Sequence, residues 1–559
     1  MRILPLVAAL SVLASVAGPL AAKTVATIDE SDRVAAGLGD YLSARFAAGS
    51  HDYAEAAKLY QASLARDPDN PDLLTFAFFY SASAGQIDEA AKYAQRLTVA
   101  TPDDRAARLT LAVAAMKKHD YRQARAEIAK SAKGPFTSFT VALIDGWAAA
   151  GAGQADDAKS QLKLLHAQKS ADGLAYFNEA MLAEMLGEKD NANTAYLAAI
   201  EAAGPTPRAV EAYGKFLERS GRTAEAKALY ERSSQESGYS LVTTPGLARI
   251  AAGTIPDAFA PRAEDGAAEA LFGIASSLND DANRDVSVLY LRLALYLNPK
   301  LDLATILLAN RFEAMGKFDD AIEAYQQVPA GSPFYRLASV AAAVDYARLD
   351  KNNEAIKRLE KLGSEYPSDL ETWTALGDSY RAAKRYGDAV NAYNRALSAD
   401  GPQSKKSWPL LYARAVAEQE SGNWPKAEAD LKQALVVSPN EPAVLNYLGY
   451  SWVDQQKNIK DALVMLEKAR ALSPQDGYII DSVGWAYYRL GRYDDAVSAL
   501  EDAVQLVPGD PTINDHLGDA YFKVGRKLDA SFQWSHALAF GPEPGDKAKI
   551  EKKLKTAGQ

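Results

Sequence analysis

Three short stretches near the end of the chain decide its fold: Tyr447-Leu448-Gly449-Tyr450, Val483-Gly484-Trp485-Ala486-Tyr487 and Leu517-Gly518-Asp519-Ala520-Tyr521. Their glycines recur at intervals of about 34 residues. After each glycine come a second small residue, a large residue, an alanine and a proline in the same order. In the middle repeat these are Ala496, Leu500, Ala503 and Pro508. This period and order indicate a repeated unit of two helices.

Each type of residue that recurs between the units has a physical reason to stand at its position. Gly484 and Ala496 are expected where the two helices of a unit cross most closely, because a larger side chain would push their axes apart. Tyr487 is expected to fill the space between this crossing and the next unit. Pro508 ends the second helix, since proline cannot continue it. Asp510-Pro511 then predicts a capped start for the following helix.

This pattern resembles the tetratricopeptide repeat (TPR), in which a W-x-x-L-G-x-x-Y helix is followed by an A-x-x-x-F helix and a proline. The resemblance implies an all-α fold, a right-handed α-solenoid of antiparallel helix pairs (the TPR superhelix), in two arrays. The first part of the chain keeps the same phase, because six of its alanines are 34 residues apart. These are Ala56, Ala90, Ala124, Ala158, Ala192 and Ala226. The whole chain accommodates about 14 units.

The phase of the repeat predicts the domain organisation. An N-terminal array is expected at 35–233 and a C-terminal array at 267–542. Between them, 234–266 contains Thr-Thr-Pro-Gly and further prolines, which favours an irregular linker. Residues 543–559 are rich in lysine and are expected to form a capping helix or tail on the last repeat.

The N-terminus and the composition favour an exported protein. Residues 1–22 combine Arg2, an apolar run and Ala21-Ala22, which predicts a secretory signal peptide and a periplasmic location. The alternative is an uncleaved helix that anchors the chain in the inner membrane. The chain has no cysteine, so we expect no disulfide and no lipid anchor at a cysteine. A net charge of −10 disfavours nucleic-acid binding.

No pattern of catalytic residues emerges from the sequence. The five histidines show no metal-binding spacing and have no nucleophile motif nearby. Acidic pairs fall at the turns between helices and do not indicate paired catalytic carboxylates. We therefore expect no enzyme activity, no metal, no cofactor and no small-molecule substrate.

The first helix of each unit is expected to line the inner groove, and its unused side chains are the candidate binding residues. In the C-terminal repeats they combine aromatic rings with amide and carboxylate groups, which suit a peptide. They are Asn446, Tyr450, Tyr478, Asp481, Trp485, Tyr488, Asp515, Asp519 and Phe522. Packing of some of these rings against a neighbouring helix is the alternative.

The same register in the first array gives a second, apolar groove. Its residues are Phe79, Leu109, Val113, Trp147, Phe177 and Met181. This stripe could receive an amphipathic helix or a partner subunit. It could equally be covered by a segment of this chain such as 234–264.

These features favour a non-enzymatic scaffold or adaptor that binds proteins or peptides in its groove. Residues 441–540 are also similar to the C-terminal part of large proteobacterial envelope TPR proteins. Some of those are adaptors of carboxyl-terminal processing proteases, so the resemblance implies such a protease or its clients as partners. The alternative is a structural subunit of a secretion, pilus or polysaccharide-export assembly that uses the apolar stripe for permanent assembly.

Overall fold

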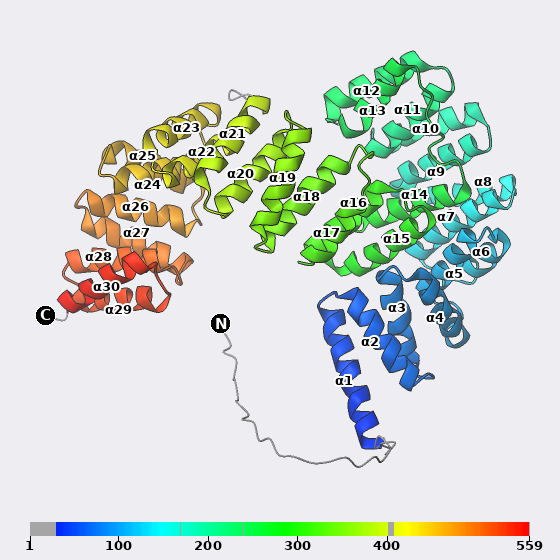
Figure 1. Cartoon of the computed structure of the whole chain (residues 1–559), viewed down its shortest axis with the longest axis horizontal. Helices are drawn as coiled ribbons and strands as arrows, with labels where there is room; N and C mark the ends of the chain where they lie inside the picture. The colour runs from blue at the N-terminus through cyan, green and yellow to red at the C-terminus, as the bar shows by residue number, and fades with distance from the viewer. Residues whose placement is uncertain (1–29, 168, 239, 401–406, 558–559) are drawn as a thin grey trace, which may run out of the picture. The chain divides into compact units, whose positions relative to one another are not determined.

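The computed structural model describes residues 30–167, 169–238, 240–400 and 407–557. These ranges form 30 α-helices and contain no β-strand, which confirms the all-α prediction (Figure 1). The predicted signal peptide at 1–22 lies outside the described residues. Contacts between residues divide the chain into two compact units, Met1–Leu164 and Leu165–Gln559. The division does not fall in the predicted linker at 234–266.

In the part of the first unit that the structure describes, from residue 30 onward, eight α-helices form four consecutive pairs. Each helix packs against the one before it and the one after it. The helices are α1 (Glu30–Gly49), α2 (Tyr53–Arg66), α3 (Pro71–Ser83), α4 (Ile87–Ala100), α5 (Arg105–Lys117), α6 (Tyr121–Ile128), α7 (Pro135–Gly151) and α8 (Ala155–Lys163).

The second unit begins with two short 3-10 turns and continues with helices α9 to α30. The first group comprises α9 (Asp172–Met185), α10 (Lys189–Ala203), α11 (Pro207–Arg219), α12 (Thr223–Ser237) and α13 (Ser240–Ala252). The middle group comprises α14 (Ala263–Ser277), α15 (Arg284–Leu297), α16 (Asp302–Ala314), α17 (Phe318–Gln326), α18 (Tyr335–Arg348), α19 (Asn352–Glu365), α20 (Leu370–Ala382) and α21 (Tyr386–Asp400). The last group comprises α22 (Trp408–Glu420), α23 (Trp424–Val437), α24 (Pro442–Asp454), α25 (Ile459–Leu472), α26 (Gly477–Arg489), α27 (Tyr493–Leu506), α28 (Pro511–Lys523), α29 (Lys527–Ala539) and α30 (Pro544–Ala557).

The first helices of successive pairs lie side by side. Contacts join α9 to α11, α18 to α20, α20 to α22, α24 to α26, and α26 to α28. The second helix of each pair packs mainly on its own partner and on the next first helix. The first helices therefore line the inner side of the array, as the repeat pattern predicts.

Glycine is required where the two helices of a pair cross. A Cβ atom on Gly484 in α26 would lie 2.6 Å from Cγ of Leu500 in α27. At the same repeat position, a Cβ on Gly377 would lie 2.4 Å from the Tyr393 ring. The expectation that Gly484 stands at a close crossing is confirmed.

The start and end signals of the helices also behave as predicted. The Asp510 side chain accepts hydrogen bonds from the backbone N–H groups of Thr512 and Ile513, and Pro511 is the first residue of α28. The preceding helix, α27, ends at Leu506, before the proline. These local signals fix the length of each helix and the spacing of the repeats.

Tyrosines at the end of the first helices link neighbouring repeats. The Tyr487 hydroxyl donates a hydrogen bond of 2.8 Å to Glu467 in the preceding pair, and the Arg492 guanidinium lies 4.3 Å from the ring centroid. Tyr521 donates in the same way to Glu501, at 2.7 Å. The hydroxyl of Tyr487 thus reaches the preceding repeat, while its ring packs against core residues shared with the next repeat, as the sequence predicts.

The range 234–266 differs from the predicted irregular linker, because it contains α13. A Cβ on Gly246 in α13 would lie 2.4 Å from the Tyr230 ring, and a Cβ on Gly214 in α11 would lie 2.2 Å from the same side chain. The Pro245-Gly246 pair that suggested a turn thus places a glycine at a close helix contact. Among the described residues of this range, only Gly238 and 253–262 are without helix.

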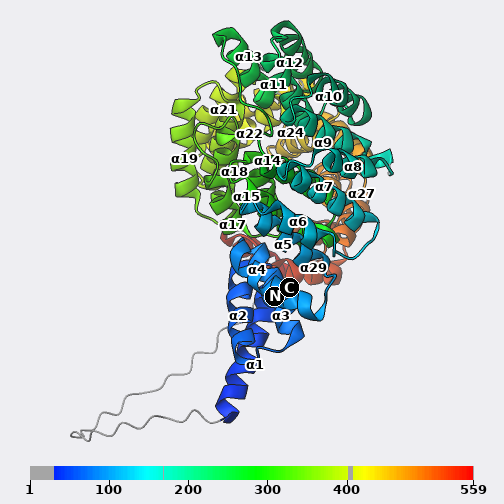
Figure 2. The same cartoon turned by 90° about the vertical axis from the view of Figure 1, so that its right-hand side faces the viewer.

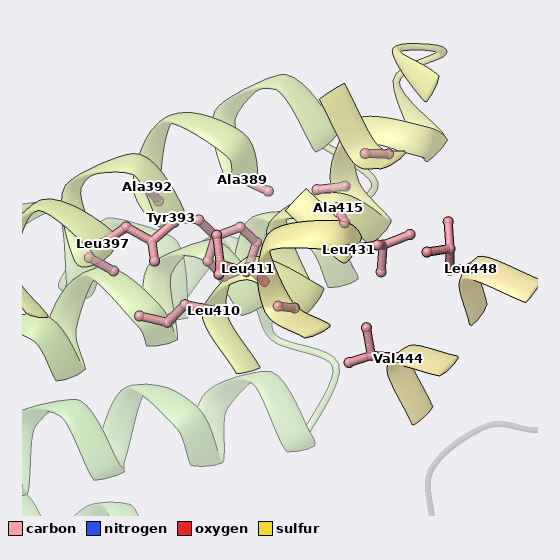
Figure 3. Packing of buried hydrophobic residues seen from close by; sticks show 14 of the residues in the cluster. Ala389, Ala392, Tyr393, Leu397, Leu410, Leu411, Ala415, Leu431, Val444 and Leu448 are labelled. Atoms are coloured by element: carbon pink, nitrogen blue, oxygen red, sulfur yellow. The ribbon is translucent and has the colours of Figure 1, made fainter. Parts of the chain in front are cut away.

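Alanines and larger apolar residues together fill the core of the second unit. Figure 3 shows Tyr393 and Leu397 of α21 packed near Leu410 and Leu411 of α22. All are buried, so consecutive pairs share a continuous core. Within the described ranges, none of the helices has the length and apolarity needed to cross a membrane.

Candidate functional site

A pocket of about 510 Å³ lies on the inner side of the last repeats. Its wall is formed by α24, α26 and α28, and α30 closes it on another side. In Figure 1 these helices follow one another at the C-terminal end of the second unit. The pocket therefore occurs where the repeat pattern predicts a binding groove, with the terminal helix as an additional wall.

Trp485 is the central ring of this pocket. Its ring is stacked on Tyr488, with centroids 4.7 Å apart, and on His516 of the next first helix, with centroids 4.0 Å apart. The indole Nε1 is buried and has no hydrogen-bond acceptor among the described residues. Trp485 is therefore held by ring stacking rather than by a polar contact.

His516 joins this stack to an acidic side chain. Its Nδ1 lies 2.9 and 3.1 Å from the two carboxylate oxygens of Asp481, and both residues are buried, with exposed fractions of 7% and 6%. Burial alone would lower the pKa of His516, but the charges of Asp481, Asp515 and Asp519 raise it above its ordinary value. A charged imidazole is thus favoured behind the Trp485 ring.

Lys553 of α30 bridges two carboxylates of α28. Its Nζ lies 2.8 Å from both carboxylate oxygens of Asp515 and 2.8 Å from Oδ2 of Asp519. Burial raises the pKa of Asp519, although Lys553 opposes that shift. These two carboxylates therefore bind the terminal helix and are largely occupied by it.

Two other charged groups in the pocket are not neutralised in this way. The Arg489 guanidinium lies 5.7 Å from the Trp485 ring centroid and donates a hydrogen bond of 3.3 Å to the backbone carbonyl of Asp454. In the described part of the chain, no carboxylate forms an ion pair with Arg489, and no cation forms one with the Asp454 side chain. Burial, with the nearby charges of Asp481 and Asp454, raises the pKa of Tyr450 to about 12. Besides Glu543 and the Lys549–Asp546 ion pair, the pocket thus offers a cation, a carboxylate and a neutral phenol.

The structure brings some of the predicted groove residues together and separates others. Tyr450, Trp485, Asp515 and Asp519 line the pocket. Tyr488 and Asp481 stand behind it, the first stacked on Trp485 and the second paired with His516. The others lie elsewhere: Asn446 is half-buried in α24, Tyr478 is 56% exposed, and Phe522 packs on Trp534.

Sequence reasoning missed Asp454, Arg489, His516 and Lys553. Asp454 and Arg489 stand four residues after Tyr450 and Trp485, so they share the same helix face and that spacing could have found them. Nothing in the repeat pattern places His516 on the Trp485 ring. Lys553 belongs to a helix outside the repeats.

A second pocket, of about 640 Å³, lies further along the same inner side. It is lined by α18, α20 and α22, and its walls are mainly apolar, with Arg348, Asp378 and Arg381 among the lining residues. It shows that the inner face is hollowed at more than one repeat.

The predicted apolar groove is not an open surface. Leu109, Val113, Trp147 and Met181 are buried and belong to the core, which explains their apolar character. Phe79 and Phe177 are half-buried. In the second unit, Phe177 of α9 is covered by other parts of the chain. Its ring contacts the Phe259 ring, with centroids 5.9 Å apart, and α14 packs against α9. Coverage by a segment of the chain, the alternative considered above, therefore holds for this part.

The site contains no grouping of three or more histidine and acidic side chains suited to a metal ion, within the residues that the structure describes. The polar groups of the pocket are instead spread over four helices.

Comparisons with known proteins agree with the repeat pattern. Models described as "Tetratricopeptide repeat" match residues 47–107, 82–137, 340–405 and 412–477, and one described as "TPR repeat" matches 484–525. The chain contains tetratricopeptide repeats. Such repeats generally serve protein–protein interaction.

The similar proteins match only in part. The TPR repeat-containing protein PA4667 of Pseudomonas aeruginosa is 28% identical over 178 residues, which is 31% of this chain and 29% of that protein. Anaphase-promoting complex subunit 6 of Arabidopsis thaliana is 26% identical over 157 residues, 28% of this chain and 27% of that protein. The matches thus span less than a third of these relatives.

Solved structures match the chain at low sequence identity. The crystal structure of the APC/C hetero-tetramer Cut9-Hcn1 covers 95% of this chain and 97% of that chain at 16% identity, with a TM-score of 0.39. A tetratricopeptide repeat protein from Parabacteroides merdae covers 46% of this chain and 99% of that chain at 17% identity, with a TM-score of 0.37.

Proposed function

We propose that this protein is a non-enzymatic adaptor of the bacterial cell envelope that binds a partner polypeptide in the pocket between α24, α26, α28 and α30. The observation that carries the proposal is the pocket itself. It combines aromatic walls with Arg489, which lies over the Trp485 ring, and Asp454, two charged groups that form no ion pair with each other or with other described side chains.

The chemistry of the pocket suits a polypeptide. Tyr450 and Trp485 supply apolar area at a low cost in side-chain entropy. Arg489 can donate to a backbone carbonyl or a carboxylate, and Asp454 can accept from a backbone N–H or a cation. A segment with alternating donors and acceptors satisfies both groups at once.

Export is part of this proposal. Residues 1–22 have the features of a secretory signal, and the envelope role rests on them. Cell fractionation, with N-terminal sequencing of the mature chain, tests it. A cytoplasmic pool with an intact N-terminus would contradict the proposal, and a membrane-bound chain that keeps these residues would favour the inner-membrane anchor.

The partner to test first is a carboxyl-terminal processing protease or one of its clients, since similarity to envelope TPR proteins suggests that class. The alternative of a structural subunit depended on the apolar stripe of the first array. That stripe is largely buried, so the observation that favoured the subunit is gone.

The adaptor proposal is testable by site-specific cross-linking in cells. A photoreactive residue is placed at Thr512, which lines the pocket and is exposed, and in parallel at Val464, which is 66% exposed on a second helix. We expect a discrete cross-linked protein at the first position and none at the second.

A matched pair of variants then connects the adduct to the pocket. Arg489→Ala removes the unpaired cation, whereas Lys523→Ala removes the cation at the same position of the next repeat, which does not line the pocket. Loss of the adduct with Arg489→Ala alone supports the proposal. Equal adducts in all variants, or the same adducts from Val464, would refute it.

A further inference from the structure

An extended segment of the chain crosses the inner face of α9 and α11. We call residues 254–261 the strap; they lie between α13 and α14 and contain no helix. Pro256 and Ala260 are buried and Phe259 is half-buried, whereas Ile255 is 77% exposed. The strap thus has one side against the repeats and one side in solvent, as a bound peptide has.

Phe259 anchors the strap through its ring. The ring packs edge-on against Phe177 of α9, with centroids 5.9 Å apart. On α11, the Arg208 guanidinium lies 4.3 Å from the ring centroid and the Lys215 ammonium lies 5.6 Å from it. Two cations and one aromatic edge form a slot for an aromatic side chain.

The cations of this slot are held by their own helix. Arg208 donates a hydrogen bond of 2.8 Å to Glu211, and Lys215 donates one of 2.8 Å to the same carboxylate. Arg208 also bonds Glu269 of α14, at 3.2 Å through its Nε. The slot is therefore arranged by α9, α11 and α14, and the strap only fills it. Figure 2 shows α14 beside α9, as their contacts require.

The backbone of the strap is weakly held in comparison. Beyond Thr254, the only hydrogen bond found between the strap backbone and the rest of the described chain is the one that Arg219 donates to the carbonyl of Asp257, at 3.1 Å. Pro256 and Pro261 cannot donate any. Pro256 and Ala260 are buried but small, so the Phe259 side chain makes the largest contribution to the affinity of the strap for the repeats.

We propose that the inner face of α9 and α11 is a second peptide-binding site, which takes an extended segment with an aromatic side chain, and that the strap occupies it as an internal competitor. A partner segment of this kind binds by placing its own aromatic ring between Arg208 and Phe177 in place of Phe259. The site is separate from the pocket at α24 to α30 and does not depend on the function proposed for it.

The test uses a fluorescent peptide with the sequence of residues 254–261, Thr-Ile-Pro-Asp-Ala-Phe-Ala-Pro, and the full chain. Its affinity is measured by anisotropy for wild type, for Phe259→Ala, and for the control Ile255→Ala, which changes an exposed side chain of the same strap. We expect Phe259→Ala to bind the peptide at least about tenfold more tightly than the other two. A peptide with alanine in place of phenylalanine should bind to none.

A second variant keeps the test decisive if Phe259→Ala does not fold. Phe259→Leu preserves the apolar volume but removes the ring face that Arg208 covers, and it should also bind the peptide more tightly than wild type. If the folded variants bind the peptide no better than Ile255→Ala does, the strap is a fixed part of the core and the proposal is wrong.

Discussion

Replacement of Gly484 by alanine should destabilise the C-terminal repeats, although alanine is the better helix former. The new Cβ would lie 2.6 Å from Cγ of Leu500, 2.9 Å from its Cδ2 and 3.4 Å from Cβ of Ala499. Leu500 is fully buried, so it has no free space to enter. Overpacking of this kind costs about 1–3 kcal/mol. The higher helix propensity of alanine stabilises the fold by about 1 kcal/mol. The free energy of unfolding should therefore fall by about 1 kcal/mol.

Gly387→Ala is the matched control, because it changes a glycine within α21 that has no other atom within 4 Å of its added Cβ. This variant should gain at most about 1 kcal/mol from helix propensity, since Gly387 lies in the first turn of α21 and the full gain applies to the helix interior. Repeat arrays need not unfold in one step, so hydrogen exchange should be followed separately in α26–α27 and in α20–α21. Equal stability changes of the same sign in the two variants would refute the close-crossing argument.

Three further predictions concern the contacts between repeats and around the pocket. Tyr487→Phe removes the hydrogen bond to the preceding repeat and should cost about 1 kcal/mol in urea titrations. Asp481→Asn breaks a buried ion pair and should cost about 3–5 kcal/mol at pH 6. Because the pKa of His516 is raised, this ion pair stabilises the fold fully below the unfolded pKa of about 6.5, and that contribution is lost as the pH rises through the folded pKa. Wild type should therefore lose more stability than Asp481→Asn between pH 6 and pH 9; an equal loss would contradict the assignment. Lys553→Met leaves Asp519 without its cation, so α30 should become more sensitive to trypsin while the exchange rates of α24 stay unchanged.

The repeat and its close crossings could be predicted because their causes are local. Gly484 is needed by a neighbour about 16 residues away in the same helix pair, and Asp510 caps the helix that directly follows it. α13 was missed because Pro245-Gly246 has the composition of a turn, while the reason for Gly246 is a ring in another helix, that of Tyr230. A local pattern cannot distinguish these two uses of glycine.

Part of the lining of the candidate site could also be predicted from the sequence. Helical register placed Tyr450, Trp485, Asp515 and Asp519 on the inner face, and they do line one pocket. The helical register could not show which of these side chains already form an ion pair within the chain. Asp515 and Asp519 are bound by Lys553, because α30 continues the array with a helix that no longer follows the repeat pattern.

The inner face of the second unit is partly covered by the chain itself, and this determines where a partner can bind. The strap fills the slot beside Arg208, and α30 neutralises the acidic face of α28. Residues that repeat packing needs cannot carry specificity, because their type is fixed by the fold. The groups left for recognition are those that vary between repeats at one position, such as Asp454 and Arg489. Specificity should therefore follow these two charges rather than the glycines and tyrosines that define the repeat.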